Sequence, residues 1–81
     1  MKIEEIKAKL AKSWKNGAYI ERPHFRCYER VYITKNGSFF HETEFRDGKV
    51  TVVPTVLEEF EAIADDWYFN DFSSNPPSKD L

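Results

Sequence analysis

The sequence is poor in cysteine and glycine and contains no long apolar segment. Its single cysteine, Cys27, cannot form a disulfide within the chain, so packing and hydrogen bonds must hold the fold together. The three glycines stand singly, at positions 17, 37 and 48, which excludes a glycine-rich phosphate-binding loop. No apolar run approaches the roughly 20 residues of a membrane span, and acidic residues follow Met1 where a signal peptide would be apolar. We therefore expect a cytoplasmic protein that has no membrane partner.

Aromatic residues, by contrast, are abundant. The 81 residues include seven Phe, four Tyr and two Trp, more than the thin core of so short a chain requires. Some of these rings should therefore reach the surface, where Tyr and Trp favour contacts with ligands or partners. The length predicts one domain over residues 1–72, and residues 73–81, which contain two consecutive prolines, are predicted to form a flexible C-terminal tail.

The net charge of −2 conceals an uneven distribution of charge. Residues 1–35 carry nine Lys or Arg against four Glu, a net of +5, whereas residues 36–81 carry three Lys or Arg against ten acidic residues, a net of −7. A bipolar molecule of this kind suits self-association into a homo-oligomer or the binding of a charged ligand. Solvated faces that merely differ in sign would give the same pattern, because surface charge has little effect on stability.

Two amphipathic helices are predicted. The first covers residues 2–15 and ends at Asn16 and Gly17, because glycine adopts the left-handed conformation of a helix C-cap without steric cost. The second runs from residue 55 to residue 67, with Thr55 and Glu58 as a capping box. Residues 67–69 would either extend this helix or form a short final strand. The apolar face of the first helix combines residues at spacings of three and four: Ile3, Ile6, Leu10 and Trp14.

Residues 19–34 are rich in aromatic and β-branched side chains and are predicted to form one strand, with Pro23 near a sheet edge. A hairpin follows at residues 35–37. A three-residue loop with a glycine bulge is preferred there to a two-residue turn, because it groups apolar residues and opposes unlike charges. It predicts three cross-strand pairs: Ile33 with Phe39, Arg30 with Glu42 and Cys27 with Phe45.

The next turn, at Asp47 and Gly48, is predicted to have two residues, and Pro54 is predicted to end the third strand. These elements predict an α+β domain: an N-terminal helix, a three-stranded antiparallel meander and a C-terminal helix, with both helices on one face of the sheet. The second turn would pair Phe45 with Val50 and Thr43 with Val52. The face beneath the helices would carry Phe25, Cys27, Val31, Ile33, Phe39, Phe45, Val50 and Val52, and the opposite face Arg26, Tyr28, Arg30, Tyr32, Phe40, Glu42 and Glu44.

Catalytic and metal-ligating patterns are weak. His24 and Cys27 have the spacing of a metal-ligand pair, but side chains three apart in a strand point to opposite faces, so neither a metal site nor a cofactor is predicted. No serine has the flanking glycines of a hydrolase nucleophile. Glu29 and His41 would form a diagonal pair beneath the helices, and a bulge that returns Glu29 to water is preferred to a functional pair. The chain is therefore predicted to bind rather than to catalyse.

The opposite face of the predicted sheet carries the more informative pattern. Arg26, Tyr28, Arg30 and Tyr32 alternate along one strand, so their side chains point the same way. Guanidinium groups bind phosphates and aromatic rings stack on bases, which suits this surface to a small anionic nucleotide. Acidic residues of the neighbouring strand neutralise part of the charge, which argues against a long nucleic acid. The same residues would equally form a solvent-facing surface of cross-strand ion pairs.

Two short segments resemble a family of small phage proteins. Residues 20–25, Ile-Glu-Arg-Pro-His-Phe, follow a helix and a glycine, as the Ile-x-Arg-Pro-x-aromatic segment does in that family. Residues 58–67 end in Ala-Asp-Asp-Trp, the motif that closes the family's chains. The family includes the second Thoeris anti-defence protein, which sequesters cyclic ADP-ribose signals without cleaving them, and its members bind ligand as oligomers in pockets involving adjacent protomers. Phe25 stands where the family usually has Trp.

This resemblance implies a non-enzymatic counter-defence protein that sequesters a cyclic nucleotide immune signal in an infected bacterial cell. Arg22, Phe25 and Trp67 match the motifs and are the implied ligand-binding residues, while Arg26 and Tyr28 are added for their chemistry. Trp67 is equally suited to be a core anchor. The alternative is a small inhibitor that docks on a host defence or transcription protein, as an anti-CRISPR protein does. Its partner-binding residues would be Tyr32, Arg30, Glu58, Glu59, Glu61, Asp65 and Asp66.

Overall fold

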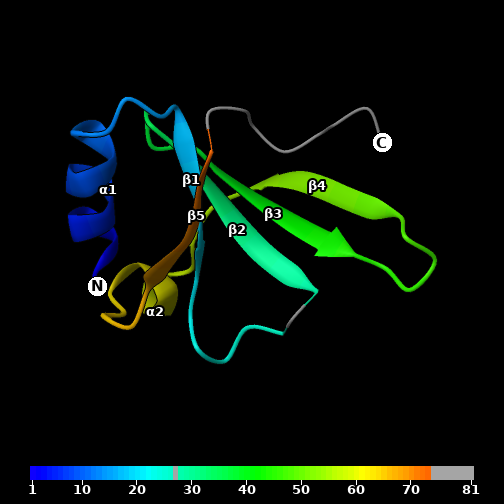
Figure 1. Cartoon of the computed structure of the whole chain (residues 1–81). Helices are drawn as coiled ribbons and strands as arrows, with labels where there is room; N and C mark the ends of the chain where they lie inside the picture. Colours follow the sequence, from blue (N-terminus) through cyan, green and yellow to red (C-terminus); the bar gives the residue numbers. More distant parts are fainter. Residues whose placement is uncertain (27, 74–81) are drawn as a thin grey trace.

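A five-stranded antiparallel sheet with helices on one side forms the protein (Figure 1). The computed structural model describes residues 1–26 and 28–73. The α+β class is confirmed, but the three-stranded meander is wrong, because the sheet has five strands in the order β4-β3-β2-β1-β5. The elements are α1 (Ile3–Ala11), β1 (Gly17–Glu21), β2 (Glu29–Thr34), β3 (Phe39–Glu44), β4 (Val50–Thr55), α2 (Glu59–Ala62) and β5 (Tyr68–Ser73).

The predicted strand over residues 19–34 is in fact two strands, β1 and β2, which pair with each other. The connection between them, called the 22–28 segment, begins with a turn in which the Phe25 N–H donates to the Arg22 carbonyl. Pro23 lies in this turn, where its fixed φ and missing N–H cost nothing. Because β1 and β2 are antiparallel neighbours, Ala18 lies opposite Ile33. The chain therefore forms one hairpin, β1–β2, ahead of the β2–β3 and β3–β4 hairpins that were predicted.

The predicted second helix is largely absent. β4 continues through Pro54 to Thr55, so Pro54 does not end the strand and Thr55 does not cap a helix. Proline is tolerated there because β4 is an edge strand, and an edge leaves one side of its backbone without a partner. The helix that follows, α2, has four residues with Glu58 as its N-cap. The chain then returns as β5 against β1, in agreement with the final strand considered for residues 67–69. The predicted tail, residues 73–81, lies outside the described residues apart from Ser73, the last residue of β5.

The two hairpins of the meander share one loop geometry. In each, a three-residue loop ends in a glycine with positive φ, +90° at Gly37 and +88° at Gly48. The predicted register of the first hairpin is confirmed for Ile33 with Phe39 and for Arg30 with Glu42, while the pair that includes Cys27 lies outside the described residues. The second register is wrong by one residue. The observed pairs are Thr43 with Thr51, Glu42 with Val52 and Glu44 with Val50, so Val50 and Val52 lie on the face away from α1.

The core lies between α1 and the sheet. Three side chains of α1 are buried against β1, β2 and Trp67, and burial of each stabilises the fold by roughly 1.5–3 kcal/mol. The helix ends at Ala11 rather than at residue 15, because the Ser13 hydroxyl accepts the Lys15 N–H at 3.0 Å and offers the backbone an alternative to the helix. Trp14, predicted on the apolar face, is consequently 80% exposed. Within the part of the chain that is described, no helix is long and apolar enough to cross a membrane.

Gly17 begins β1 instead of capping a helix. A Cβ atom at this position would lie 2.3 Å from the Tyr32 hydroxyl oxygen and 2.5 Å from its ring carbon Cζ. The Tyr32 side chain is only 1% exposed, so its ring has little room to move away. The Ile33 carbonyl oxygen would lie 2.7 Å away as well, so Gly17 is required by the close approach of a buried ring and of the neighbouring strand's backbone, and not by its φ.

We predict that Gly17→Ala lowers the free energy of unfolding by roughly 1–3 kcal/mol, the usual cost of overpacking. Urea denaturation monitored by tryptophan fluorescence measures this loss. The same substitution in a Tyr32→Val background should cost clearly less, because the clashing ring is gone. An equal loss in both backgrounds would show that the Tyr32 ring is not the constraint.

Candidate functional site

The two segments that carry the phage-family resemblance meet in the structure. Arg22 forms a two-point ion pair with Asp66, with Nε–Oδ1 and Nη2–Oδ2 distances of 2.6 and 3.3 Å. Hydrogen bonding from Arg22 lowers the pKa of the Asp66 carboxyl. The rings of Phe25 and Trp67 meet edge to face at 5.6 Å, and the Arg22 guanidinium lies 6.0 Å from the Trp67 ring. Arg22, Phe25 and Trp67, the residues that the resemblance implies for ligand binding, thus lie in one cluster.

This cluster has little capacity left for a ligand. Trp67 is 1% exposed and its Nε1–H donates to the Glu61 carbonyl at 2.8 Å, so it serves as a core anchor. The guanidinium of Arg22 is already matched by a carboxylate. A ligand would have to displace Asp66 before Arg22 could bind a phosphate.

Arg26 and Tyr28 lie apart from this cluster, at a hollow of about 430 Å³. The Tyr28 carbonyl accepts the Glu44 N–H at 2.9 Å, which extends the β2–β3 pairing by one step and brings the turn after β3 beside Tyr28. Arg26 Nη1 donates to the Tyr28 hydroxyl at 2.7 Å, and this hydrogen bond raises the pKa of Arg26. The hollow is lined by Arg26, Tyr28, Thr43, Glu44, Phe45 and Arg46.

Phe45 and Arg46 are functional candidates that the sequence analysis missed. Phe45 was expected beneath the helices, but it stands at the start of the β3–β4 turn and is 51% exposed. Tyr28 is 41% exposed, so two aromatic rings border the same hollow. The confirmed β2–β3 register pairs Glu29 with Thr43, and the next pair along would be residues 28 and 44. This register therefore indicates that Tyr28 lies beside the start of the β3–β4 turn.

The remaining residues of the predicted Arg/Tyr surface are engaged by other side chains, although the Arg30 side chain is 43% exposed. Glu42 is 7% exposed and accepts hydrogen bonds from Arg30 Nε at 2.9 Å and from the Tyr19 hydroxyl at 3.2 Å. The Arg30 guanidinium also lies 4.3 Å from the centre of the Tyr19 ring. Tyr32 is buried, in edge-to-face contact with Tyr19. Arg30 and Tyr32, predicted as partner-binding residues, therefore belong to a structural network and not to a free binding face.

A smaller cleft of about 290 Å³ opens beneath the 22–28 segment and contains Glu29 and His41. The expected bulge at Glu29 is wrong, since β2 pairs with β3 without interruption from Glu29 onward. Glu29 Oε2 lies 3.5 Å from His41 Nε2, and its other oxygen accepts the Arg26 N–H at 3.1 Å. His24 and Glu61 also line this cleft. Among the described residues, no three His, Cys, Asp or Glu side chains are arranged to hold a metal ion.

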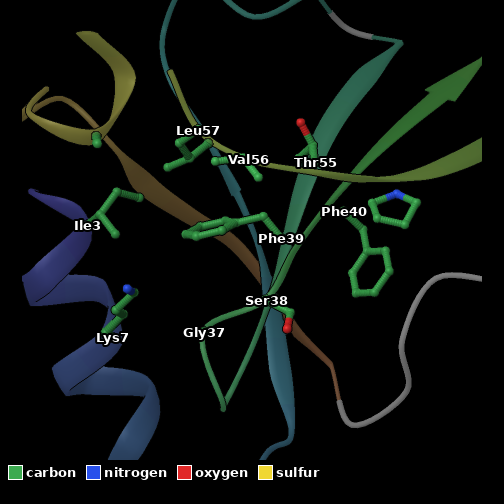
Figure 2. Close-up of a pocket in the computed structure, with 11 residues that line it drawn as sticks. Ile3, Lys7, Gly37, Ser38, Phe39, Phe40, Thr55, Val56 and Leu57 are labelled. Atoms are coloured by element: carbon green, nitrogen blue, oxygen red, sulfur yellow. The ribbon is translucent and has the colours of Figure 1, made fainter. Parts of the chain in front are cut away.

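The segment between β4 and β5 carries the predicted acidic residues and several exposed apolar side chains. Val56, Phe60 and Ile63 are 86%, 63% and 70% exposed. The acidic side chains among them, Glu58, Glu59 and Asp65, are exposed as well, and Glu61 is half-buried. A groove of about 680 Å³ runs beside this segment, between α1, the β2–β3 turn at Gly37 and Ser38, and the adjoining ends of β3 and β4 (Figure 2). No protein-family model, curated protein or solved structure matches this chain.

The Tyr19–Glu42 contact generates a pH dependence of stability. Burial, assisted by the negative charge of Glu42 and the hydrogen bond to it, raises the pKa of Tyr19 from 10.0 to about 12. The folded state therefore holds this proton more tightly than the unfolded state, and the free energy of unfolding falls as pH rises from 10 to 12.

We predict that Tyr19→Phe makes this alkaline decline shallower. Some decline should remain, because burial also raises the pKa of Tyr32. Urea midpoints measured across this pH interval test the prediction, with Tyr68→Phe, at an exposed strand position, as the matched control. If the free energy of unfolding of the Tyr19→Phe protein fell with pH as steeply as that of the wild type, the decline would have to come from other groups.

Proposed function

We propose that this protein binds a small anionic nucleotide in the hollow bordered by Arg26, Tyr28, Phe45 and Arg46. The observation that supports this most directly is that, within the described part of the chain, two of the arginines are ion-paired and two are not. Arg22 and Arg30 are paired with Asp66 and Glu42 at 2.6 and 2.8 Å. Arg26 and Arg46 have no carboxylate within ion-pairing distance among residues 1–26 and 28–73, and both line the same hollow.

The geometry of the hollow fits the two parts of a nucleotide. Two guanidinium groups offer charge-assisted hydrogen bonds to phosphate oxygens. The half-exposed rings of Tyr28 and Phe45 offer flat apolar surfaces on which a base can stack. A volume of about 430 Å³ lies within the usual range of small-molecule sites, and Glu44 at its rim disfavours a ligand with many phosphates.

The biological role that we propose is counter-defence by sequestration. The resemblance of residues 20–25 and 58–67 to the phage anti-defence family supports a cyclic nucleotide immune signal as the ligand, held without cleavage. Sequestration requires affinity and not a catalytic base, so two arginines that have no carboxylate partner among the described residues and two stacking rings would be sufficient for it.

A second candidate function is inhibition of a host defence or transcription protein by direct docking. The exposed apolar side chains of Val56, Phe60 and Ile63, surrounded by acidic residues, favour it. Apolar side chains that are exposed together and rimmed by polar groups commonly mark protein-binding surfaces. This surface is separate from the hollow, so the two functions are tested by different variants.

We predict that protein purified from cells that produce a cyclic nucleotide signal retains that nucleotide and releases it intact on denaturation. Mass spectrometry of the released fraction identifies the ligand, and isothermal titration with cyclic ADP-ribose and with linear ADP-ribose measures affinity and selectivity. Recovery of a cleaved product would contradict binding without turnover. A stable complex with a host protein and no bound nucleotide would favour the second candidate.

The arginines provide matched variants for locating the site. Arg26→Ala and Arg46→Ala should each weaken nucleotide binding by about tenfold or more, since hydrogen bonds to charged groups contribute roughly 1.5–3 kcal/mol. Arg22→Ala is the control: it should lower stability by removing the partner of Asp66, and leave affinity nearly unchanged. The reverse pattern would place the ligand at the Arg22–Trp67 cluster instead.

A further inference from the structure

The groove beside α1 is apolar, open and framed by three separate parts of the chain. Figure 2 shows the Phe39 ring pointing toward α1, with Ile3 and Lys7 on one side and Val56 and Leu57 on the other. Phe40 points to the opposite side of β3, where it pairs with Pro54 at the sheet edge. The groove therefore continues around the start of β3 and the end of β4, beside the β2–β3 turn, and its volume of about 680 Å³ exceeds that of one large side chain.

Trp14 is an apolar side chain without a place in the core of its own chain. It follows α1 in the turn before β1 and is 80% exposed, far more than a Trp ring normally is. The turn that carries it is held in position, because Lys35 donates to the carbonyls of Asn16 and Ser13 through its backbone N–H and its ammonium group. A rigid, exposed Trp is a common binding hot spot.

The charges around Trp14 and around the groove are complementary. The Lys15 ammonium lies 4.1 Å from the centre of the Trp14 ring, and Lys12 is exposed nearby in sequence. The segment that closes the groove carries exposed carboxylates at Glu58 and Glu59. Lys7, on the α1 side of the groove, faces the Phe39 ring at 5.8 Å, where a second aromatic ring would offer it a further cation–π contact. The opposite net charges of residues 1–35 and 36–81 are thus found on two surfaces, one basic around Trp14 and one acidic beside the groove.

We propose that the groove receives Trp14 of a second copy of this chain, with Lys12 and Lys15 of that copy facing Glu58 and Glu59. The ring packs on Phe39 and Val56, and the lysines remain at the polar rim. The contact joins two different surfaces, so each copy contributes one Trp14 and one groove. The nucleotide hollow has no residue in common with this contact, and the inference does not depend on the proposed function.

Sedimentation velocity over a range of concentrations and salt tests this contact. The wild-type protein should self-associate, and more weakly at high salt because charges at the rim are screened. Trp14→Ser should weaken self-association by about 30-fold or more, the effect of removing a hot-spot Trp. Val56→Lys, at a position 86% exposed and hence unimportant for folding, should weaken it also, by placing a charge in the groove opposite the incoming lysines.

Two variants serve as matched controls. Val53→Lys introduces the same charge on β4 outside the groove, and Tyr68→Ser removes an exposed aromatic ring from β5. Both should associate like the wild type, and Trp14→Ser should keep its affinity for cyclic ADP-ribose.

Mixing the two defective variants gives the decisive result. The Trp14→Ser protein retains an intact groove and the Val56→Lys protein an intact Trp14, so together they should form a one-to-one complex that neither forms alone. Failure of the mixture to associate would overturn the proposal, because a contact between identical surfaces cannot be restored in this way. A wild-type protein that stays monomeric at all concentrations would overturn it too, and would leave the groove to a different protein.

Discussion

Trp67 joins the beginning and the end of the described chain, and the positions of the surrounding segments depend on this contact. Its backbone N–H donates to the Met1 carbonyl at 3.1 Å, and its indole N–H donates to the Glu61 carbonyl at 2.8 Å. Its ring also supports Phe25 in the 22–28 segment. A chain of 81 residues buries little apolar surface, so one fully buried indole is a large share of its core. Through these contacts Trp67 fixes the start of α1, the α2 segment and the approach to Arg26 together.

Burial explains why Arg22 and Arg30 form structural ion pairs while Arg26 and Arg46 are left for the proposed binding site. The side chain of Arg22 is 15% exposed, and the partner of Arg30, Glu42, is 9% exposed at its side chain. A charge that is mostly removed from water needs an opposite charge to compensate for its lost hydration. Arg26 and Arg46 are exposed and have no such requirement. Under the proposed function their charge would be available for an anion, and the rings beside them would exclude water from its phosphate.

Local patterns in the sequence were sufficient for α1 and for the first hairpin, but not for the topology. The three-residue loop at residues 35–37 followed from matching charges and apolar residues across the strands, and the observed pairs of Arg30 and Ile33 agree with it. The second hairpin has the same loop, yet the alternation of Val50 and Val52 favoured the wrong register. Both are half-buried on the face away from α1, while Val53 on the other face is 51% exposed, so the valines of this edge strand do not mark the core face. The break at residues 22–28 and the short α2 depend on how Trp67 and Phe25 pack, which periodicity does not encode.

For the candidate site, sequence patterns pointed to arginine and tyrosine side chains, but they did not show which of these side chains lie together. Alternation along one assumed strand placed Arg26, Tyr28, Arg30 and Tyr32 on a single face. Only the first two are exposed, because the strand begins at Glu29 and the rest of the face is occupied by the Glu42 network. Phe45 and Arg46 join the hollow through the turn after β3, and the β2–β3 register places the start of that turn beside Tyr28.

The acidic α2 segment and the proposed nucleotide hollow consist of different residues, although Phe25, the residue before Arg26, packs on Trp67 shortly after α2. In Figure 1 the turn between β3 and β4 lies on the side of the sheet away from α1 and α2, and the molecule extends 35 Å along its longest axis. Exposed charges are screened over about 8 Å at physiological ionic strength, so an anion at Arg26 and Arg46 would respond mainly to the charges that line the hollow, Glu44 among them. The net charge of −2 is therefore a poor guide to ligand preference. What matters for binding is the sign of the charge within each surface, and a chain that is basic in its first 35 residues and acidic thereafter can present one surface to an anion and another to a basic partner.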